Sequence, residues 1–111
     1  MIDHDQIAAR YEGDEDLIRA VCEAFIGEQP ELILDLEKAL SDQSREQVRK
    51  AAHALKGSAL NVGAIEFSER ARSLEVSAMS IDWAEIEALV HQLSRDSESS
   101  LTEIRNRYLS S

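Results

Sequence analysis

The stretch AAHALKGSALNVGA, residues 51–64, has the composition of a helix but contains a glycine in its interior. Gly57 at this position costs roughly 0.5–1 kcal/mol relative to alanine, which suggests that open space beside His53 matters more than helix stability. With about 100° of rotation per residue, Leu55 and Ala59 lie near the centre of the apolar stripe, and His53 lies roughly 150° away from it. The sequence therefore predicts a helix that presents His53 on the face opposite the core.

This helix is predicted to run from about residue 45 to residue 61. Ser44, followed three residues later by Gln47, resembles a capping box, and Asn61 and Gly63 mark the end. Its apolar stripe needs partner helices to cover it. The stripe consists of Val48, Ala51, Ala52, Leu55, Ala59 and Val62.

Two further helices are predicted towards the C-terminus. The first covers about residues 64 to 78, and Asp82 with Glu85 three residues later starts the second. Both have apolar residues at helical spacing. These are Ile65, Phe67, Ala71, Leu74 and Ala78 in the first, and Trp83, Ile86, Leu89, Val90, Leu93, Leu101, Ile104 and Tyr108 in the second.

The N-terminal part of the chain has weaker boundaries. We expect a short helical lead-in over residues 3–11, followed by a helix capped by Asp14 or Asp16. A glycine and Pro30 interrupt the stripe of that helix, so a second segment is predicted to start near residue 29, with one kinked helix as the alternative. The apolar positions are Leu17, Ile18, Val21, Cys22, Phe25 and Ile26 before the proline and Leu32, Ile33, Leu36, Ala39 and Leu40 after it.

Several amphipathic helices with short connections and no strand pattern predict an all-α fold. The expected architecture is an antiparallel up-and-down four-helix bundle with a short N-terminal helical lead-in. The chain has 111 residues, 43% of them hydrophobic, which is enough for one core. We therefore expect a single domain over residues 1–111, with its bundle core at about 14–109.

The formal net charge of −10 limits the possible partners. Nucleic acid and acidic membrane surfaces would be repelled, because no strong basic patch is visible in the sequence. No apolar run approaches the ~20 residues that span a bilayer, and the N-terminus lacks the pattern of a secretory signal. Cys22 is the single cysteine, so neither a disulfide nor a cysteine metal site is expected, and a cytoplasmic protein fits best.

The outward face of the central helix combines groups that suit phosphoryl chemistry at a docked interface. An exposed neutral imidazole at His53 is a competent nucleophile near neutral pH, and Lys56 can neutralise an anion bound at the ring. Gly57 allows another protein's backbone to approach closely, and the small Ala54 leaves the imidazole unobstructed. Leu60 also points outward and offers apolar contact area to a partner.

Together with its flanks, this stretch resembles the histidine-containing phosphotransfer (HPt) domain family. The family signature, a helix bearing H-x-L-K-G-S/A followed by an N-x-G-A-like turn, here reads AHALKGSALNVGA. The upstream DLIRAVCEAFIGEQPELILDLEKAL and the downstream FSERARSLE, with its Leu74–Glu75 pair, also look like the family's segments. The likeness covers about residues 14 to 95.

The resemblance implies specific roles. His53 would be phosphorylated on its outward ring nitrogen, Lys56 would stabilise the phosphoryl group, and Gly57 would admit the partner. Ser58 matches the motif but turns towards the core edge, which gives it a structural role. The protein would be a monomeric carrier without ATP-dependent kinase activity. Its partners would be receiver domains of response regulators or of hybrid sensor histidine kinases, and these would supply the Mg²⁺.

Other functions stay open beside this one. A non-phosphorylated helical adaptor would bind a receiver domain through the same face, and Arg49 belongs either to such a docking surface or to plain solvated surface. The phosphoacceptor domain of a histidine kinase would place an acid directly after the histidine, where Ala54 stands. His4, in an expected mobile lead-in, and His91, on a polar face, show no metal-ligand spacing with His53, so no metal site is predicted. No hydrolase arrangement is evident.

Overall fold

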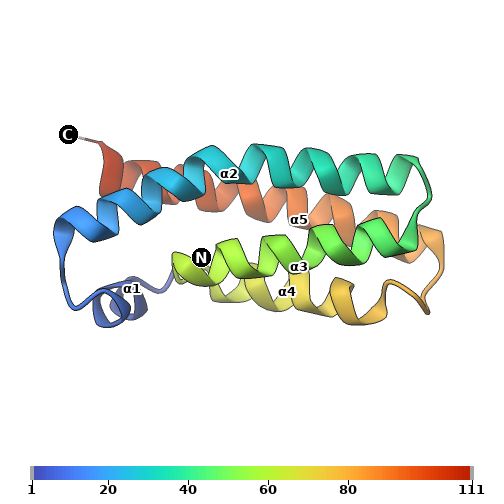
Figure 1. The fold of residues 1–111 in the computed structure, drawn as a ribbon, viewed down its shortest axis with the longest axis horizontal. Helices are drawn as coiled ribbons and strands as arrows, with labels where there is room; N and C mark the ends of the chain where they lie inside the picture. Colours follow the sequence, from blue (N-terminus) through green and yellow to red (C-terminus); the bar gives the residue numbers. More distant parts are fainter. Residues whose placement is uncertain (1, 111) are drawn as a thin grey trace.

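The computed structural model describes residues 2–110 and is helical throughout, with no strand in that range (Figure 1). This confirms the all-α prediction. Five α-helices are followed directly by a π-helical segment. They are α1 (His4–Arg10), α2 (Glu15–Ser41), α3 (Arg45–Asn61), α4 (Ile65–Ser77), α5 (Trp83–Ile104) and η1 (Arg105–Leu109).

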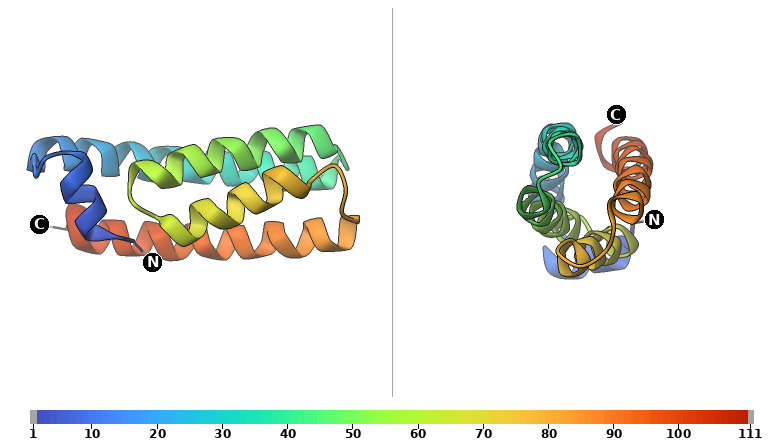
Figure 2. Two further views of the ribbon diagram at one scale, coloured as in Figure 1. Left: turned by 90° about the horizontal axis from the view of Figure 1, so that it is seen from below. Right: turned by 90° about the vertical axis from the view of Figure 1, so that its right-hand side faces the viewer.

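The four longer helices lie side by side, and the chain reverses direction at the turn between each consecutive pair (Figures 1 and 2). Helix α3 packs against both α2 and α4, and α2 also packs against α5. The short α1 crosses one end of this group (Figure 2). Helix α3 thus has a neighbour on either side and one face left for solvent.

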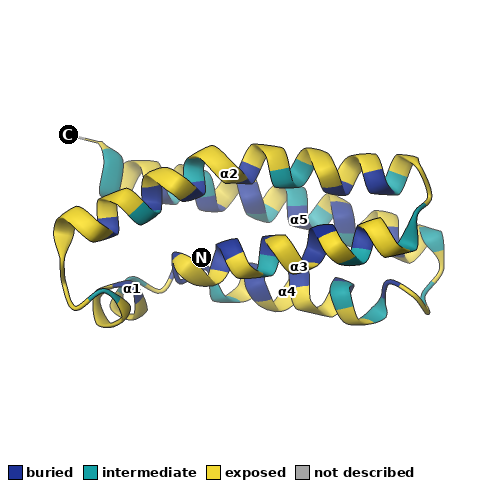
Figure 3. Cartoon of the chain, viewed as in Figure 1, coloured by how far each residue is buried: buried dark blue, intermediate teal, exposed yellow. Residues whose placement is uncertain are grey.

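The core lies between the four long helices, where their buried positions face one another (Figure 3). Every residue of the predicted α3 stripe is buried, and so are the predicted Phe67, Ala71, Leu74 and Ala78 of the following segment. Cys22 is 1% exposed, as its place in an apolar stripe predicts. Leu17 is the exception, because it is 45% exposed and lies outside the core.

Side-chain caps fix the starts of the helices. Ser44 accepts a hydrogen bond from the Gln47 amide at 3.2 Å, and Asp82 accepts one from the Glu85 amide at 2.9 Å, both as predicted. Asp14 caps α2 by accepting from the Leu17 amide at 3.1 Å, which decides between the two predicted caps. These bonds satisfy backbone donors that have no partner inside the helix.

Helix α2 continues through Pro30 without a break. The prediction of a second segment near residue 29 was therefore wrong. Of the alternative, one kinked helix, the structure confirms the continuity through the proline. Proline removes one backbone hydrogen bond, which costs about 3 kcal/mol in a helix interior. Phe25 and Gln29 before the proline and Leu36 after it are all buried on one face, and this burial outweighs the local penalty.

The N-terminal lead-in is packed against the bundle rather than loose. Ile2 is 4% exposed and Ile7 is 1% exposed, so the core extends to residues before position 14, unlike the predicted core of 14–109. The Asp3 amide donates to the Gly63 carbonyl at 2.8 Å. Gly63 has φ +67°, and a Cβ there would lie 2.7 Å from the Asp3 carbonyl oxygen, so both the turn and this contact require glycine.

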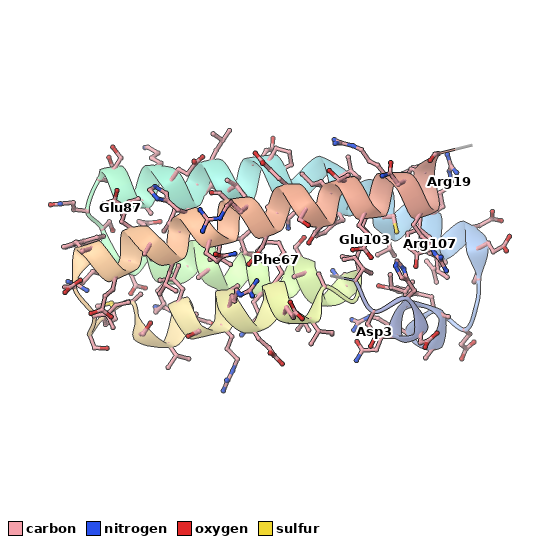
Figure 4. The ribbon with its side chains drawn as sticks, turned by 180° about the vertical axis from the view of Figure 1, so that it is seen from behind. Asp3, Arg19, Phe67, Glu87, Glu103 and Arg107 are labelled. Carbon is pink, nitrogen blue, oxygen red and sulfur yellow. The ribbon has the colours of Figure 1, made fainter. Side chains whose placement is uncertain are left out.

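The two ends of the chain also meet through side chains. His4 Nδ1 lies 2.6 Å from the Tyr108 hydroxyl, and its Nε2 lies 2.8 Å from Glu103 Oε2. Figure 4 shows Glu103 and Arg107 at the same end of the bundle as Asp3. The prediction of a mobile segment around His4 was wrong, because its contacts are with residues about 100 positions away in the sequence. The predicted domain of 1–111 includes two terminal residues that lie outside the described range.

None of the described helices is both long enough and apolar enough to cross a membrane.

Candidate functional site

His53 lies on the solvent-facing side of α3. Its side chain is 64% exposed, in agreement with the predicted outward orientation. Leu55 and Ala59, on the opposite face of the same helix, are fully buried. The apolar face of α3 therefore fixes the orientation of the helix, and the orientation of the helix exposes the imidazole.

Glu75 of α4 reaches across to His53. Its Oε2 lies 2.5 Å from His53 Nδ1, and its Oε1 accepts a hydrogen bond from Lys56 Nζ at 2.9 Å. The Glu75 side chain is only 16% exposed because α4 packs closely against α3. One carboxylate thus connects the two residues that the sequence motif singles out.

The electrostatic environment keeps Glu75 ionised. The hydrogen bond from Lys56 is the largest cause that lowers the pKa of this carboxyl, partial burial opposes it, and the contact with His53 lowers the pKa further. An ionised carboxylate can only accept hydrogen bonds, so Nδ1 of a neutral His53 must carry the ring proton. The lone pair is then on Nε2. Among residues 2–110 no side chain hydrogen-bonds to Nε2.

Lys56 is more enclosed than the sequence suggested. Its side chain is 25% exposed, and its ammonium group is bonded to Glu75. Sequence reasoning placed Lys56 beside a phosphoryl group on the ring. The structure shows in addition that Lys56 holds the carboxylate that orients His53.

Gly57 is exposed, and a Cβ built on it would meet no atom within 4 Å. Internal packing therefore gives no reason for glycine at this position. Ala54 is exposed on the side of His53 that faces α2, and Leu60 is 41% exposed. All three surround His53 with small or apolar surface.

Arg49 is one turn before His53 on the same outward face. It forms a two-point ion pair with Glu46, in which Nε lies 3.1 Å from Oε2. This pair is exposed to solvent, so its contribution to stability is small. The contact does not decide between the two assignments made from the sequence.

Beneath the site, a buried polar network ties α3 to its neighbours. Gln29, fully buried in α2, donates to Ser58 Oγ at 3.1 Å and accepts from Ser97 Oγ of α5 at 2.9 Å. Ser58 in turn donates to Glu28 Oε1 at 3.2 Å. The structural role predicted for Ser58 agrees with this geometry. Such a satisfied network holds three helices in one register.

Sequence reasoning missed the roles of Glu75 and Gln29. Glu75 was noted only as part of a resembling Leu–Glu pair, and its distance of 22 residues from His53 gave no local signal. The burial of Gln29 could not be predicted because Gln29 lies beside Pro30, where a helix boundary was expected. A helical wheel places Glu75 next to the buried stripe of α4, and this was the one available sign of a contact with α3.

The other groups to consider are possible metal ligands, the Cys22 thiol and His91. Within residues 2–110 no three His, Cys, Asp or Glu side chains come together as metal ligands. Burial raises the pKa of the Cys22 thiol to about 11, so it stays protonated and unreactive near neutral pH. His91 is exposed, as predicted.

Comparison with known proteins agrees with this geometry. A family model described as "Hpt domain" matches residues 20–99. The fold is similar to the crystal structure of histidine-containing phosphotransfer protein B (HptB) from Pseudomonas aeruginosa PAO1, with a TM-score of 0.88 at 24% sequence identity, over 97% of this chain and 94% of that chain. No curated protein matches the sequence. Because the family model covers more than half of the sequence, the chain belongs to the Hpt domain family.

Proposed function

We propose that the protein is a phosphotransfer carrier of a two-component phosphorelay, in which His53 on an antiparallel up-and-down four-helix bundle accepts and passes on a phosphoryl group. The observation that supports this most strongly is the state of the imidazole. Its Nδ1 contacts a carboxylate at 2.5 Å, while its Nε2 faces solvent on a side chain that is 64% exposed.

In the proposed reaction the Nε2 lone pair of His53 attacks the phosphorus of a phosphoaspartate on a receiver domain. The N–P bond forms as the P–O bond to the aspartate breaks, and the electron pair leaves on the aspartate carboxylate. The ring becomes a phosphorylated imidazolium whose Nδ1–H faces Glu75. An aspartate of a second receiver then attacks the phosphorus, and the neutral ring is regenerated.

Glu75 would act as a positioning residue. Its carboxylate fixes the ring tautomer and stabilises the positive charge that develops on the imidazole. Lys56 holds Glu75 and, at the edge of the ring, adds positive charge near the incoming phosphoryl group. Gly57, Ala54 and Leu60 provide the close approach and the apolar contact, with Arg49 at the border of the docking surface.

The remaining expectations belong to the same proposal. As the family resemblance implies, the receiver would supply the Mg²⁺ and most of the catalytic groups. The protein would carry the phosphoryl group without consuming ATP. It would work as a monomer in the cytoplasm, with response regulators or hybrid sensor histidine kinases as partners.

The test is to incubate the protein with a panel of phosphorylated receiver domains and to follow acid-labile, base-stable label. Label is expected on the wild type and not on His53→Gln. His91→Gln is the matched control, since it removes another exposed histidine and should still accept label. If a receiver binds the wild type without any transfer, the adaptor function replaces the carrier function.

A further inference from the structure

The charge of the protein is distributed very unevenly around the bundle. Helix α3 carries four of the 12 Lys and Arg residues and one of the 22 Asp and Glu residues, so its net charge is +3, while the rest of the chain has −13. Helix α2 contains seven acids and two bases, and α5 contains five acids and one base. The helix that carries His53 is therefore a basic region on an acidic protein.

Three of the four cations of α3 are already engaged within the protein. Arg45 donates to the carbonyls of Ala78 and Ile81 and lies over the Trp83 ring. Arg49 pairs with Glu46, and Lys56 pairs with Glu75. These contacts reduce what these side chains can offer to a partner.

Lys50 and Arg72 remain available beside the site. Both side chains are exposed, and neither forms an ion pair with another residue in the described range 2–110. Lys50 lies one turn before His53 and lines the groove between α2 and α3. Arg72 lies one turn before Glu75 in α4, and Glu75 contacts His53 from the opposite side. Lys50 thus lies on the α2 side of the helix that carries His53, and Arg72 belongs to α4, the helix on the other side.

The donor in the proposed function brings negative charge to this face. A phosphoaspartate carries an anionic phosphoryl group, so an opposing positive potential favours its approach to His53. The acidic surfaces of α2 and α5 repel the same partner. Charges arranged in this way orient the encounter and raise the association rate more than they raise the final affinity.

We infer that the α3–α4 face docks a receiver domain with an acidic rim, which Lys50 and Arg72 contact on opposite sides of His53 while the acidic faces of α2 and α5 disfavour other orientations. This inference rests on the proposed function. It identifies the partner by the charge around its phosphorylated aspartate. It also assigns binding roles to two residues outside the sequence motif.

The experiment measures the rate of phosphoryl transfer from a phosphorylated receiver by rapid quench, over a range of receiver concentrations and at two ionic strengths. The variants are Lys50→Glu, Arg72→Glu and, as the control, Arg95→Glu. Each changes the net charge by the same amount at an exposed position, and Arg95 lies on α5, where its contact is with Gln92 of the same helix. The quantities compared are the second-order rate constant and the limiting rate at saturation.

At low salt we expect Lys50→Glu and Arg72→Glu each to lower the second-order rate constant by roughly threefold to tenfold, within the range of electrostatic steering, while the limiting rate stays unchanged. The Arg95→Glu effect should be clearly smaller. The differences should shrink at high salt because the charges are exposed and screened.

Equal effects of all three variants would show a general dependence on net charge and would overturn the inference. No effect of Lys50→Glu and Arg72→Glu would also overturn it, while normal transfer to His53 in the same experiment would leave the proposed function intact. A wild-type protein that accepts no phosphoryl group from any receiver would overturn the proposed function, and the inference with it.

Discussion

His4 and His53 are both in contact with a glutamate, yet the two imidazoles differ in their hydrogen-bond partners and in their exposure to solvent. His4 has a partner at each ring nitrogen, the Tyr108 hydroxyl at Nδ1 and Glu103 at Nε2, and its side chain is 28% exposed. Within residues 2–110 His53 has a partner at Nδ1 alone, and its side chain is 64% exposed. A neutral His4 uses its ring proton and its lone pair inside the protein, whereas His53 keeps one nitrogen for an external group.

Under the proposed function, the difference indicates what allows one histidine and not the other to carry a phosphoryl group. A carboxylate neighbour is common to both sites, so it is not the deciding feature. The deciding features are a second ring nitrogen without a partner and a helix face that leaves it exposed. His4 closes the two ends of the chain onto each other, and His53 lies open to solvent, where the proposed function places the partner.

The largest expected effect separates the two histidines directly. His53→Gln should lose all phosphorylation with little change in melting temperature, because the side chain lies outside the core. His4→Gln should accept the phosphoryl group normally. Receiver-dependent labelling combined with thermal unfolding measures both. A large fall in the melting temperature of His53→Gln would show that His53 has a structural role, which would contradict its assignment to the exposed face of α3.

Replacing the carboxylate at Nδ1 tests whether positioning matters. Glu75→Gln keeps the size of the side chain but removes the charge that fixes the ring tautomer, and we expect transfer to slow by roughly 10- to 100-fold. The pH dependence of the transfer rate should also change, which a merely structural role would not produce. Glu103→Gln, the equivalent change at His4, is the control and should transfer at the wild-type rate.

Gly57→Gln tests whether the proposed docking face needs open space beside His53. The substitution adds a side chain where an added Cβ meets no atom, and it improves helix propensity, so the fold should stay intact and gain at most about 1 kcal/mol. Transfer should slow on the order of tenfold because the partner can no longer approach closely. Gly27→Gln, at another open helical glycine, should leave transfer unchanged. Wild-type transfer by Gly57→Gln would refute the close-approach explanation.

At the other histidine, the expected effect is on stability alone. Tyr108→Phe removes the hydroxyl that lies 2.6 Å from His4 Nδ1 and should lower the free energy of unfolding by about 1 kcal/mol. Urea unfolding gives this value, and the transfer rate should not change. Slower transfer in this variant would mean that the end of the bundle and the His53 face are coupled.

The smallest effect concerns pH and the ionised state of Glu75. Its folded-state pKa lies below the ordinary value for a glutamate, so the carboxylate contributes stability that is fully present above about pH 4.5 and is lost as the pH falls through the folded-state pKa. The stability advantage of the wild type over Glu75→Gln should therefore shrink below pH 4.5. Unfolding measured at pH 7 and at pH 3 tests this, and an advantage that grows in acid would contradict the assigned cause.

Much of the fold could be predicted from the sequence because the signals were local. The α3 stripe and the caps at Ser44 and Asp82 depend on residues three or four positions apart, and the structure confirms them. The outward orientation of His53 followed from the same periodicity. The local signal at Pro30 predicted a helix boundary that does not exist. Helix α2 continues through the proline because residues of its buried face lie on both sides of it.

Only the α3 part of the candidate site could be predicted from the sequence. His53, Lys56 and Gly57 lie within one turn or so of each other, so a wheel places them on one face. Glu75 comes from another helix, and only the packing of α4 on α3 brings its carboxylate to the ring. The His4 contacts join positions 99 and 104 residues apart, a separation over which periodicity gives no information.

The most direct test of the central claim is NMR of the protein labelled with ¹⁵N at its histidine rings, recorded before and after phosphoryl transfer from a receiver. We expect the phosphoryl group on Nε2 of His53 and a proton on Nδ1, with the resonances of His4 and His91 unchanged. Phosphorylation at Nδ1, or on either of the other two histidines, would contradict the claim that Glu75 prepares the outward nitrogen of His53 to carry the group.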